Sequence, residues 1–269
     1  MGVVNVTPDS FSDGGLWLDP AKAVAHGLEL VAEGAAIVDV GGESTRPRAE
    51  PVGAEEELRR VLPVIEGIVT AGPAVVVSID TSKRAVAEAA IDAGATFVND
   101  VTALRGDGEL AGLVADRGTE LCVMHMLGDP RTMQDDPRYD DVVDDVRAFL
   151  EERIAYAVGE GVAEERILVD PGIGFGKTVD HNLELLRRLD EIVAIGRPVV
   201  VGTSRKSFLG KITGRDVGDR LPGTIATNVV ALALGASVFR VHDVAPVADA
   251  LAVAAATFGT WPATSTTTS

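Results

Sequence analysis

The feature that most constrains this chain is a strict alternation of short apolar runs with longer segments of helical spacing. Each run is continuously apolar until its last residues, which is typical of parallel strands covered on both faces. Amphipathic segments such as 19–34 and 82–94 lie between the runs, with a cap or proline at the start and a glycine at the end. The eight runs are "MGVVNV", "AAIVDV", "AVVVSID", "TFVND", "ELCVMH", "RILVD", "PVVVGTS" and "SVFRVHD".

Eight such units predict an α/β fold, the (β/α)8 TIM barrel. The units recur about every 34 residues, which matches a barrel of roughly 250 residues. An open, doubly wound sheet is the alternative, because periodicity does not show whether a sheet closes. We expect one domain over residues 1–258 and a disordered polar tail over 259–269.

Composition excludes several kinds of partner. The net charge is −17, whereas nucleic acids and anionic membranes select for an excess of Lys and Arg, so we expect neither partner. No run approaches the roughly 18 apolar residues of a membrane helix, and we expect neither export nor insertion. The single cysteine, Cys122, lies in an apolar run, which predicts a core residue of a protein in the reducing cytoplasm.

The segment "DPGIGFGKT", residues 170–178, looks at first like a nucleotide phosphate loop. A Walker loop needs a glycine five places before its Gly-Lys-Thr, so that backbone N–H groups surround the phosphate. Pro171 stands there and has no N–H. We therefore interpret the segment as a strand that ends at Asp170, followed by a glycine-rich loop.

Each apolar run ends in a polar group that is capable of chemistry. In a barrel the C-terminal ends of all strands form one mouth, so these groups would converge on a single site. Any one of them could instead cap the following helix, but that explanation is strained for all eight. The groups are Asn5, Asp39, Asp80, Asn99, His125, Asp170, Ser204 with Arg205 and Lys206, and Arg240 with His242.

These residue types suit a heterocycle with an amino-pyrimidinone edge. Carboxylates accept from its N–H groups and a lysine donates to its carbonyl, a pattern that Asp80, Asn99, Asp170 and Lys206 offer. Positive charge for a phosphate or pyrophosphate would come from another set, which comprises Arg46, Arg240 and His242, with Arg205 nearby.

The histidines do not have the spacing of zinc ligands. We expect His26 and His181, in helical segments, to face solvent and His125 to pack at a strand end. A hard cation such as Mg²⁺, held by Asn5 and by phosphate oxygens of a substrate, is the metal that the sequence favours.

Two long polar loops follow the first two strands. Residues 7–17 and 41–53 are rich in Gly and Pro and carry Phe11 and Arg46. Long loops on a rigid barrel are usually binding loops or lids, so we expect both to serve the site rather than to be ordinary surface loops.

Eight segments together resemble the dihydropteroate synthase family, the pterin-binding barrel enzymes of folate biosynthesis. Their agreement in order and spacing over about residues 1–255 is specific, where any one segment would be weak. The segments are "MGVVNVTPDSFSDGG", "IVDVGGESTRP", "SIDTSK", "FVND", "VMHM", "DPGIGFGKT", "GTSRKSFLG" and "FRVHDV".

The resemblance implies a reaction and a role for individual residues. The reaction condenses 7,8-dihydropterin pyrophosphate with 4-aminobenzoate, with Mg²⁺, in a cytoplasmic homodimer. The implied pterin residues are Asp80, Asn99, Met124, Asp170 and Lys206. Asn5 would bind Mg²⁺, while Arg46, Arg240 and His242 would bind pyrophosphate. The implied aminobenzoate pocket comprises Phe11, Pro47, Phe175, Lys206 and Ser207, and the implied catalytic residues are Asp13, Thr45, Arg46 and Lys206.

Two departures and two alternatives accompany the resemblance. Family members commonly carry an N-terminal extension, and Arg48 stands where they often have Gly; a start at Met1 predicts some loss of stability and Arg48 an altered loop closure. The alternatives are a methyltetrahydrofolate-binding methyltransferase, which would not be expected to keep "STRP" and "SRKS", and a non-catalytic pterin-binding paralogue. No insertion near Phe11 would exclude a sulfonamide, so we expect sensitivity to these drugs.

Overall fold

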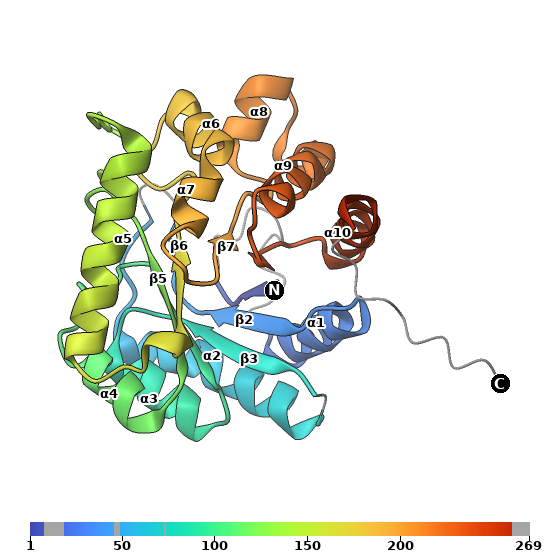
Figure 1. Cartoon of the computed structure of the whole chain (residues 1–269). Helices are drawn as coiled ribbons and strands as arrows, with labels where there is room; N and C mark the ends of the chain where they lie inside the picture. Colours follow the sequence, from blue (N-terminus) through green and yellow to red (C-terminus); the bar gives the residue numbers. More distant parts are fainter. Residues whose placement is uncertain (8–18, 46–48, 73, 260–269) are drawn as a thin grey trace.

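The computed structural model describes residues 1–7, 19–45, 49–72 and 74–259. Eight strands alternate with helices that surround them, with α5 and α10 on opposite sides in Figure 1. The strands are β1 (Gly2–Asn5), β2 (Ile37–Gly41), β3 (Val76–Asp80), β4 (Phe97–Asp100), β5 (Glu120–Met124), β6 (Ile167–Asp170), β7 (Val200–Val201) and β8 (Val238–Phe239). The helices are α1 (Pro20–Ala32), α2 (Ala54–Thr70), α3 (Arg84–Asp92), α4 (Leu110–Arg117), α5 (Val142–Gly159), α6 (Val179–Arg187), α7 (Leu189–Val193), α8 (Ser207–Thr213), α9 (Leu221–Ala233) and α10 (Val244–Phe258), with short 3-10 turns η2 (Glu164–Arg166) and η3 (Val217–Asp219).

The strands close into a barrel. Strands β1 to β6 form one parallel sheet in chain order, and β7 pairs with β8 in parallel. Single bridges join the two sheets on both sides, from Val169 to Val199 and from Gly2 to Val241. The predicted (β/α)8 barrel is therefore confirmed, and the open doubly wound sheet is not the fold.

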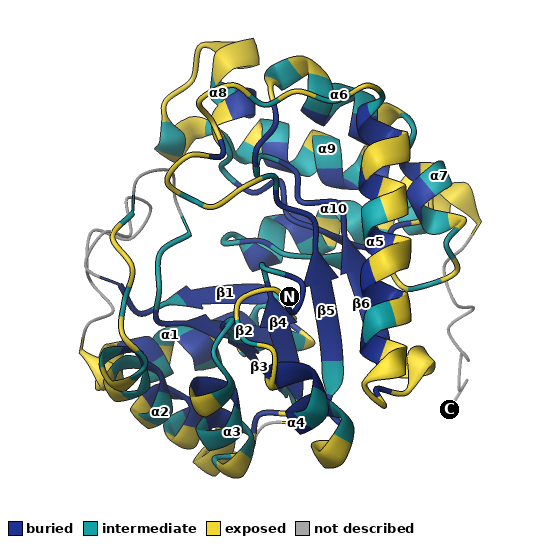
Figure 2. Cartoon of the chain, turned by 90° about the vertical axis from the view of Figure 1, so that its left-hand side faces the viewer, coloured by how far each residue is buried: buried dark blue, intermediate teal, exposed yellow. Residues whose placement is uncertain are grey.

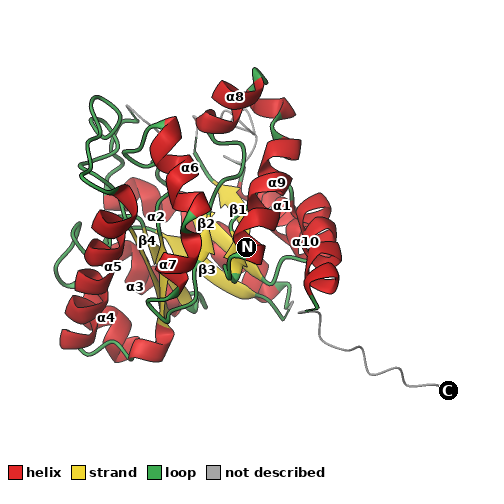
Figure 3. Cartoon of the chain, turned by 45° about the horizontal axis from the view of Figure 1, so that its top comes forward, coloured by secondary structure: helices red, strands yellow, loops and turns green. Residues whose placement is uncertain are grey.

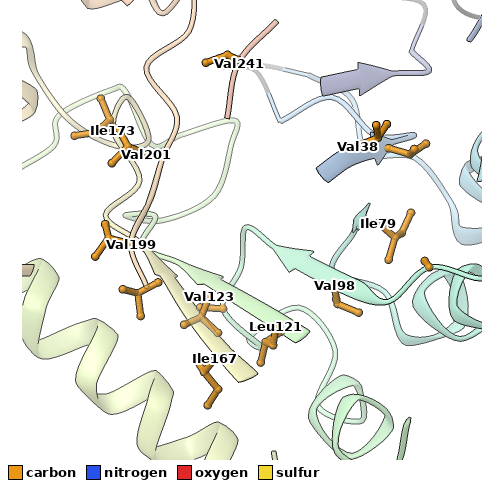
Figure 4. Close-up of a cluster of buried hydrophobic side chains, with 14 of the residues drawn as sticks. Val38, Ile79, Val98, Leu121, Val123, Ile167, Ile173, Val199, Val201 and Val241 are labelled. Carbon is orange, nitrogen blue, oxygen red and sulfur yellow. The ribbon is translucent and has the colours of Figure 1, made fainter. Parts of the chain in front are cut away.

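The outer faces of the strands bury the main core. Alternate residues of a strand point to opposite faces, and the outward set packs under the helices, as the dark strands and lighter helix surfaces in Figure 2 show. Figure 4 shows part of this core, including Val123 on β5 and Ile167 on β6. This shell of Val, Ile and Leu explains why every run in the sequence is continuously apolar.

Local signals place the helices where the pattern predicts them. The Asp19 carboxylate accepts from Ala21 N at 3.0 Å to cap α1, and the helix begins at Pro20. The capping box of α6 joins Thr178 and His181, so the threonine of "GKT" starts a helix. Gly94 takes a positive φ of 110° just after α3. None of the described helices is long and apolar enough to cross a membrane.

The inward faces divide into two levels. Figure 3 shows the strands at the centre of the molecule with helices around them. An apolar floor lies inside, at the N-terminal ends of the strands. Its buried members are Phe97, Cys122, Leu168 and Val200, with Ile37, Val76 and Val238 packed against them. Cys122 is therefore core, as predicted. The inward residues nearer the C-terminal ends of the same strands are mostly polar, and they form the candidate site.

Candidate active site

Asp39 on β2 is the centre of a buried polar layer above the floor. Its carboxylate accepts from Ser78 Oγ at 2.6 Å and from Asn99 Nδ2 at 3.1 Å. Ser78 on β3 and Asn99 on β4 face the inside of the barrel together with Asp39, as the register of β2, β3 and β4 requires. The layer fixes the amide of Asn99, which the sequence predicts to contact a ligand.

Arg240 joins this layer to the mouth of the barrel. Its Nε donates to Asp39 at 2.7 Å and its Nη2 donates to Asp80 at 2.8 Å. Burial raises the pKa of Asp80 to about 7, against the lowering effect of Arg240 and with the help of the Asp39 charge. The two carboxylates share one guanidinium, so the site retains a negative charge for N–H donors of a ligand.

Asp170, Lys206 and Arg240 converge around Gly202. A side chain at this glycine would place its Cβ 3.8 Å from Lys206 Nζ, 3.9 Å from Arg240 Cβ and 4.0 Å from Asp170 Oδ2. Burial lowers the pKa of Lys206 to about 8, an effect that the Asp170 charge opposes. Burial raises the pKa of Asp170, and the Lys206 charge opposes it. The structure thus brings together residues that are distant in sequence: Asp170 and Lys206, which the sequence analysis assigned to the heterocycle, and Arg240, which it assigned to the pyrophosphate.

Asn5 lies beside Asp80 at the end of β1. A Cβ on Gly41 would be 3.7 Å from Asn5 Oδ1 and 3.6 Å from Asp80 Oδ2. In the described part of the chain no three His, Cys, Asp or Glu side chains are grouped to hold a metal ion. Mg²⁺ keeps several waters and binds through one or two protein oxygens plus phosphate. The neighbouring amide and carboxylate oxygens fit that requirement.

Phe175 and Met124 lie at another side of the mouth. Met124, Met126 and Met133 form a small buried cluster against Phe175. Lys206 Nζ lies 4.5 Å from the centre of the half-buried Phe175 ring. Ser207, the first residue of α8, is exposed next to Lys206. Phe175, Lys206 and Ser207 therefore border one region of the surface.

His242 lies on the segment after β8, at the same end of the barrel. Its N donates to Ser204 Oγ at 3.1 Å, and its Nδ1 lies 3.0 Å from the same oxygen. Arg205 pairs with Asp243, its Nε donating at 2.9 Å, in a left-handed conformation with φ of 56°. This ion pair is a structural role that the sequence did not predict for Arg205.

The loop after β2 is anchored at its base. Lys83 Nζ donates to both Glu43 and the fully buried Glu57, and Val52 N donates to Glu43 Oε1 at 3.0 Å. This anchor holds the described ends of the segment that carries Thr45, which is half-buried. The predicted site residues Phe11, Asp13, Arg46 and Pro47, and the unusual Arg48, lie outside the described residues.

The remaining histidines differ partly from expectation. His125 is buried against Phe149, with ring centres 4.9 Å apart, so the packed role is confirmed. The prediction that His26 and His181 face solvent is wrong, because both are only partly exposed. His26 lies 3.4 Å from Glu29, and His181 packs edge-on against Tyr139. Helical position alone does not tell which face of an outer helix meets a neighbour.

Sequence reasoning assigned no specific role to two residues near the site. Asp39 was expected at the mouth with the other strand-end groups, but its place at the centre of the polar layer was not predicted. Lys177 was treated only as part of a false Walker match. Lys177 is buried, with only 3% of its surface exposed, and its Nζ lies 2.8 Å from His125 Nδ1. The available signal was a lysine directly after the apolar, glycine-rich stretch "GIGFG".

Known proteins resemble this chain along nearly its whole length. The family model described as pterin binding enzyme matches residues 1–242. Dihydropteroate synthase of Escherichia coli K12 is 46% identical over 257 residues, 96% of this chain and 90% of the relative. The Yersinia pestis dihydropteroate synthase, solved with a sulfonamide drug complex, has a TM-score of 0.93 at 41% identity and covers 96% of this chain and 94% of its own. The Xanthomonas albilineans enzyme in complex with 7,8-dihydropteroate has a TM-score of 0.86 at 46% identity, covering 96% and 92%.

Proposed function

The chain belongs to the pterin-binding enzyme family as a dihydropteroate synthase, and we propose that it binds the pterin at the barrel mouth around Gly202. It condenses 7,8-dihydropterin pyrophosphate with 4-aminobenzoate, giving 7,8-dihydropteroate and pyrophosphate in folate biosynthesis. The observation that carries the location of the site is the convergence of Asp170, Lys206 and Arg240 on the space next to Gly202.

The pterin is read by groups of opposite polarity. Asp170 accepts from the amino edge of the ring, and Lys206 donates to its carbonyl. Asp80 and Asn99, on neighbouring strands in register, contact the other ring nitrogens, and Met124 packs against the ring. Support for this arrangement comes from burial, because a charged group removed from water interacts strongly with a matching ligand group.

The pyrophosphate lies on the side of Arg240 and His242, with Arg46 from the loop after β2. Asn5 would hold Mg²⁺ there, with Asp80 nearby. When bound, Mg²⁺ offsets negative charge on the leaving group and so promotes its departure. The residues of this chain orient the pterin so that its exocyclic methylene carbon faces the second substrate.

The aminobenzoate pocket comprises Phe11, Pro47, Phe175, Lys206 and Ser207. The ring packs on Phe175, and its carboxylate faces Ser207 and Lys206. The relative from Yersinia pestis was solved with a sulfonamide drug, which shares an aniline ring with aminobenzoate. We expect the drug to compete with aminobenzoate in this pocket.

The reaction breaks the bond from the methylene carbon to the pyrophosphate oxygen and forms a bond from that carbon to the aryl nitrogen. The electron-rich pterin stabilises the developing cation, and an aspartate on a closing loop, Asp13, adds to that effect with Thr45 and Arg46. The aryl amine is neutral at pH 7 and loses a proton to water after attack. No general base is assigned.

A homodimer in the cytoplasm completes the proposal. The outer face formed by α9 and α10 is apolar, and Val253, Val230 and Phe258 are 68%, 47% and 47% exposed on it. A shallow groove on this face is lined by Val229, Ala250, Val253 and Phe258 among others. Exposed apolar patches of this kind mark interfaces. Light scattering that gives a monomer at micromolar concentration would remove the dimer from the account.

One assay tests the function itself. The purified chain is mixed with dihydropterin pyrophosphate, 4-aminobenzoate and Mg²⁺, and released pyrophosphate and dihydropteroate are measured together. Equal amounts of both are expected, with loss of turnover in excess EDTA. Tight binding of the pterin with neither product would indicate a non-catalytic paralogue, and turnover that persists in EDTA would remove the metal.

A further inference from the structure

In the loop between β6 and α6, residues 171–178, most of the backbone N–H and C=O groups do not belong to the hydrogen-bond pattern of a helix or a strand. Every second residue is a glycine in the left-handed region, with φ of 66° at Gly172, 86° at Gly174 and 63° at Gly176. At Gly172 a Cβ would lie only 1.8 Å from the His125 carbonyl oxygen, so the loop packs directly on the segment after β5. The conformation must be held by other groups.

Four consecutive carbonyls of this loop each accept a hydrogen bond from a side chain, three of them from outside the loop and one from Lys177 within it. Lys206 Nζ donates to Ile173 O. Gln134 Nε2 donates to Gly174 O at 2.7 Å, and Lys177 Nζ donates to Phe175 O at 3.0 Å. Tyr139 OH donates to Gly176 O at 2.7 Å. We call these four donors the carbonyl row. Together with the hydrogen bonds from Gly174 N to Asn182 Oδ1 and from Phe175 N to Gly172 O, they hold the backbone at Phe175 in place.

Lys206 differs from the other three donors because it also faces the pterin site. The Lys206 ammonium has three N–H groups, so it can donate to Ile173 O and to a pterin carbonyl at the same time. The proposed function gives none of the other three donors a contact with the pterin. Lys206 therefore takes part in both subsites, whereas the other three donors contact the loop alone or the protein interior.

Lys177 is the buried member of the carbonyl row. Its Nζ contacts Phe175 O and His125 Nδ1, and two N–H groups are enough for both contacts when the ring proton is on Nε2. Burial, with the Lys206 charge, lowers the pKa of Lys177 well below its usual range, against the effect of Asp170. Burial and the Lys177 charge lower the pKa of His125 to about 2, so the ring stays neutral and accepts.

We infer that Lys177, Tyr139 and Gln134 are positioning residues for the second substrate: they hold Phe175 against aminobenzoate without touching either substrate. The inference rests on the proposed function, since it takes Phe175 as a wall of the aminobenzoate pocket. It also makes Lys206 a link between the two subsites, because this one donor of the row also faces the proposed pterin site.

The test uses Tyr139→Phe, which removes one hydroxyl and keeps the ring contact with His181. At saturating pterin pyrophosphate, the KM for aminobenzoate should rise about threefold to tenfold, as expected for the loss of one hydrogen bond. The KM for the pterin substrate should stay unchanged. Tyr156→Phe is the matched control, because Tyr156 lies on α5 and contacts Arg153 rather than the loop. Lys177→Met should have a larger effect, with Lys22→Met on exposed α1 surface as its control.

A double-mutant cycle separates positioning from general destabilisation. Phe175→Ala alone should raise the KM for aminobenzoate, and adding Tyr139→Phe to it should change little more. If Phe175→Ala has no effect, the aminobenzoate pocket of the proposed function is wrong and the inference falls with it. If Phe175→Ala has the effect while Tyr139→Phe behaves like Tyr156→Phe, or adds its full effect to Phe175→Ala, the inference alone is overturned. Should Lys177→Met fail to fold, the Tyr139 variants decide.

Discussion

The apolar floor and the polar mouth of this barrel are built from the same strands, often from residues two positions apart. On β6, Leu168 belongs to the floor and Asp170 to the mouth. On β4, Phe97 belongs to the floor and Asn99 to the polar layer, where it donates to Asp39. Because the period of a strand is two, both residues of each pair face inward. One step along an inward face therefore separates a side chain of the apolar core from a side chain that we propose to bind the pterin.

The two regions differ in their energetics. Burial of the floor removes apolar surface from water and stabilises the fold. Burial of the mouth removes charges from water, which raises the pKa of Asp80 and Asp170 and lowers that of Lys206. Desolvated charges that are only partly paired lower stability, so the mouth is maintained for its ligand rather than for the fold.

The largest effect is expected on stability, from a substitution in the apolar floor. Phe97 is fully buried, so Phe97→Ala should lower the free energy of unfolding by about 3–5 kcal/mol through lost burial and a cavity. Urea denaturation measures this change, while calorimetry on the folded protein should show the same pterin affinity as the parent. A pterin affinity that falls in step with stability would mean that floor and mouth are not separable.

Next in size is a change in the mouth. Asp170→Ala should cost about 2–4 kcal/mol in pterin binding, because a buried ligand donor loses its acceptor. Asp170→Asn should also be impaired, since one acceptor oxygen becomes a donor. Calorimetry with a pterin lacking pyrophosphate measures both, and denaturation measures the separate cost of losing the buried hydrogen bond that Gly172 N donates to Asp170 at 2.7 Å. An unchanged pterin affinity would remove Asp170 from the site.

A smaller effect follows from the ionisation of Lys206. Its pKa is lowered to about 8, so the amine is charged below that pH and neutral above it. The kcat/KM for the pterin substrate should therefore fall as the pH rises through about 8. Lys206→Arg, which stays protonated, should move the fall to higher pH. A profile that is identical in Lys206→Arg would assign the titration to another group; Lys211→Arg on the same helix is the control.

The smallest effect concerns the rim of the mouth. Ser207 is exposed at the start of α8, so Ser207→Ala should weaken aminobenzoate and sulfamethoxazole alike by about 0.5–1.5 kcal/mol. Competition kinetics measure both constants. A drug that inhibits uncompetitively with aminobenzoate, or a variant that affects only one of the two ligands, would contradict a shared pocket.

The sequence could predict buried parallel strands that alternate with helices, because all eight runs are continuously apolar, but the runs did not show whether the sheet closes. The strand ends Asp80, Asn99 and Asp170 follow from the same pattern, although their ligands stay predictions. The last two strands are shorter than their runs, since β7 and β8 have two residues each and the polypeptide leaves the ladder near Gly202 and Arg240.

Contacts between distant strands could not be predicted in this way. Arg240 pairs with Asp39 and Asp80, which are 201 and 160 residues away, and only the closure of the barrel brings them together. The carbonyl row has the same origin: Gln134 and Tyr139 come from an irregular segment whose path has no periodic signal. Local patterns report which face a residue takes but not which partner it meets there.

The most direct test of the account is a crystal structure of this chain with 7,8-dihydropteroate bound. We predict that the pterin ring lies beside Gly202, with its amino edge within hydrogen-bond distance of Asp170 and its carbonyl next to Lys206 Nζ, and that the aminobenzoate ring packs on Phe175. A ligand held elsewhere on the barrel, or a pterin turned so that Asp170 faces no N–H group, would contradict the assignment of the mouth.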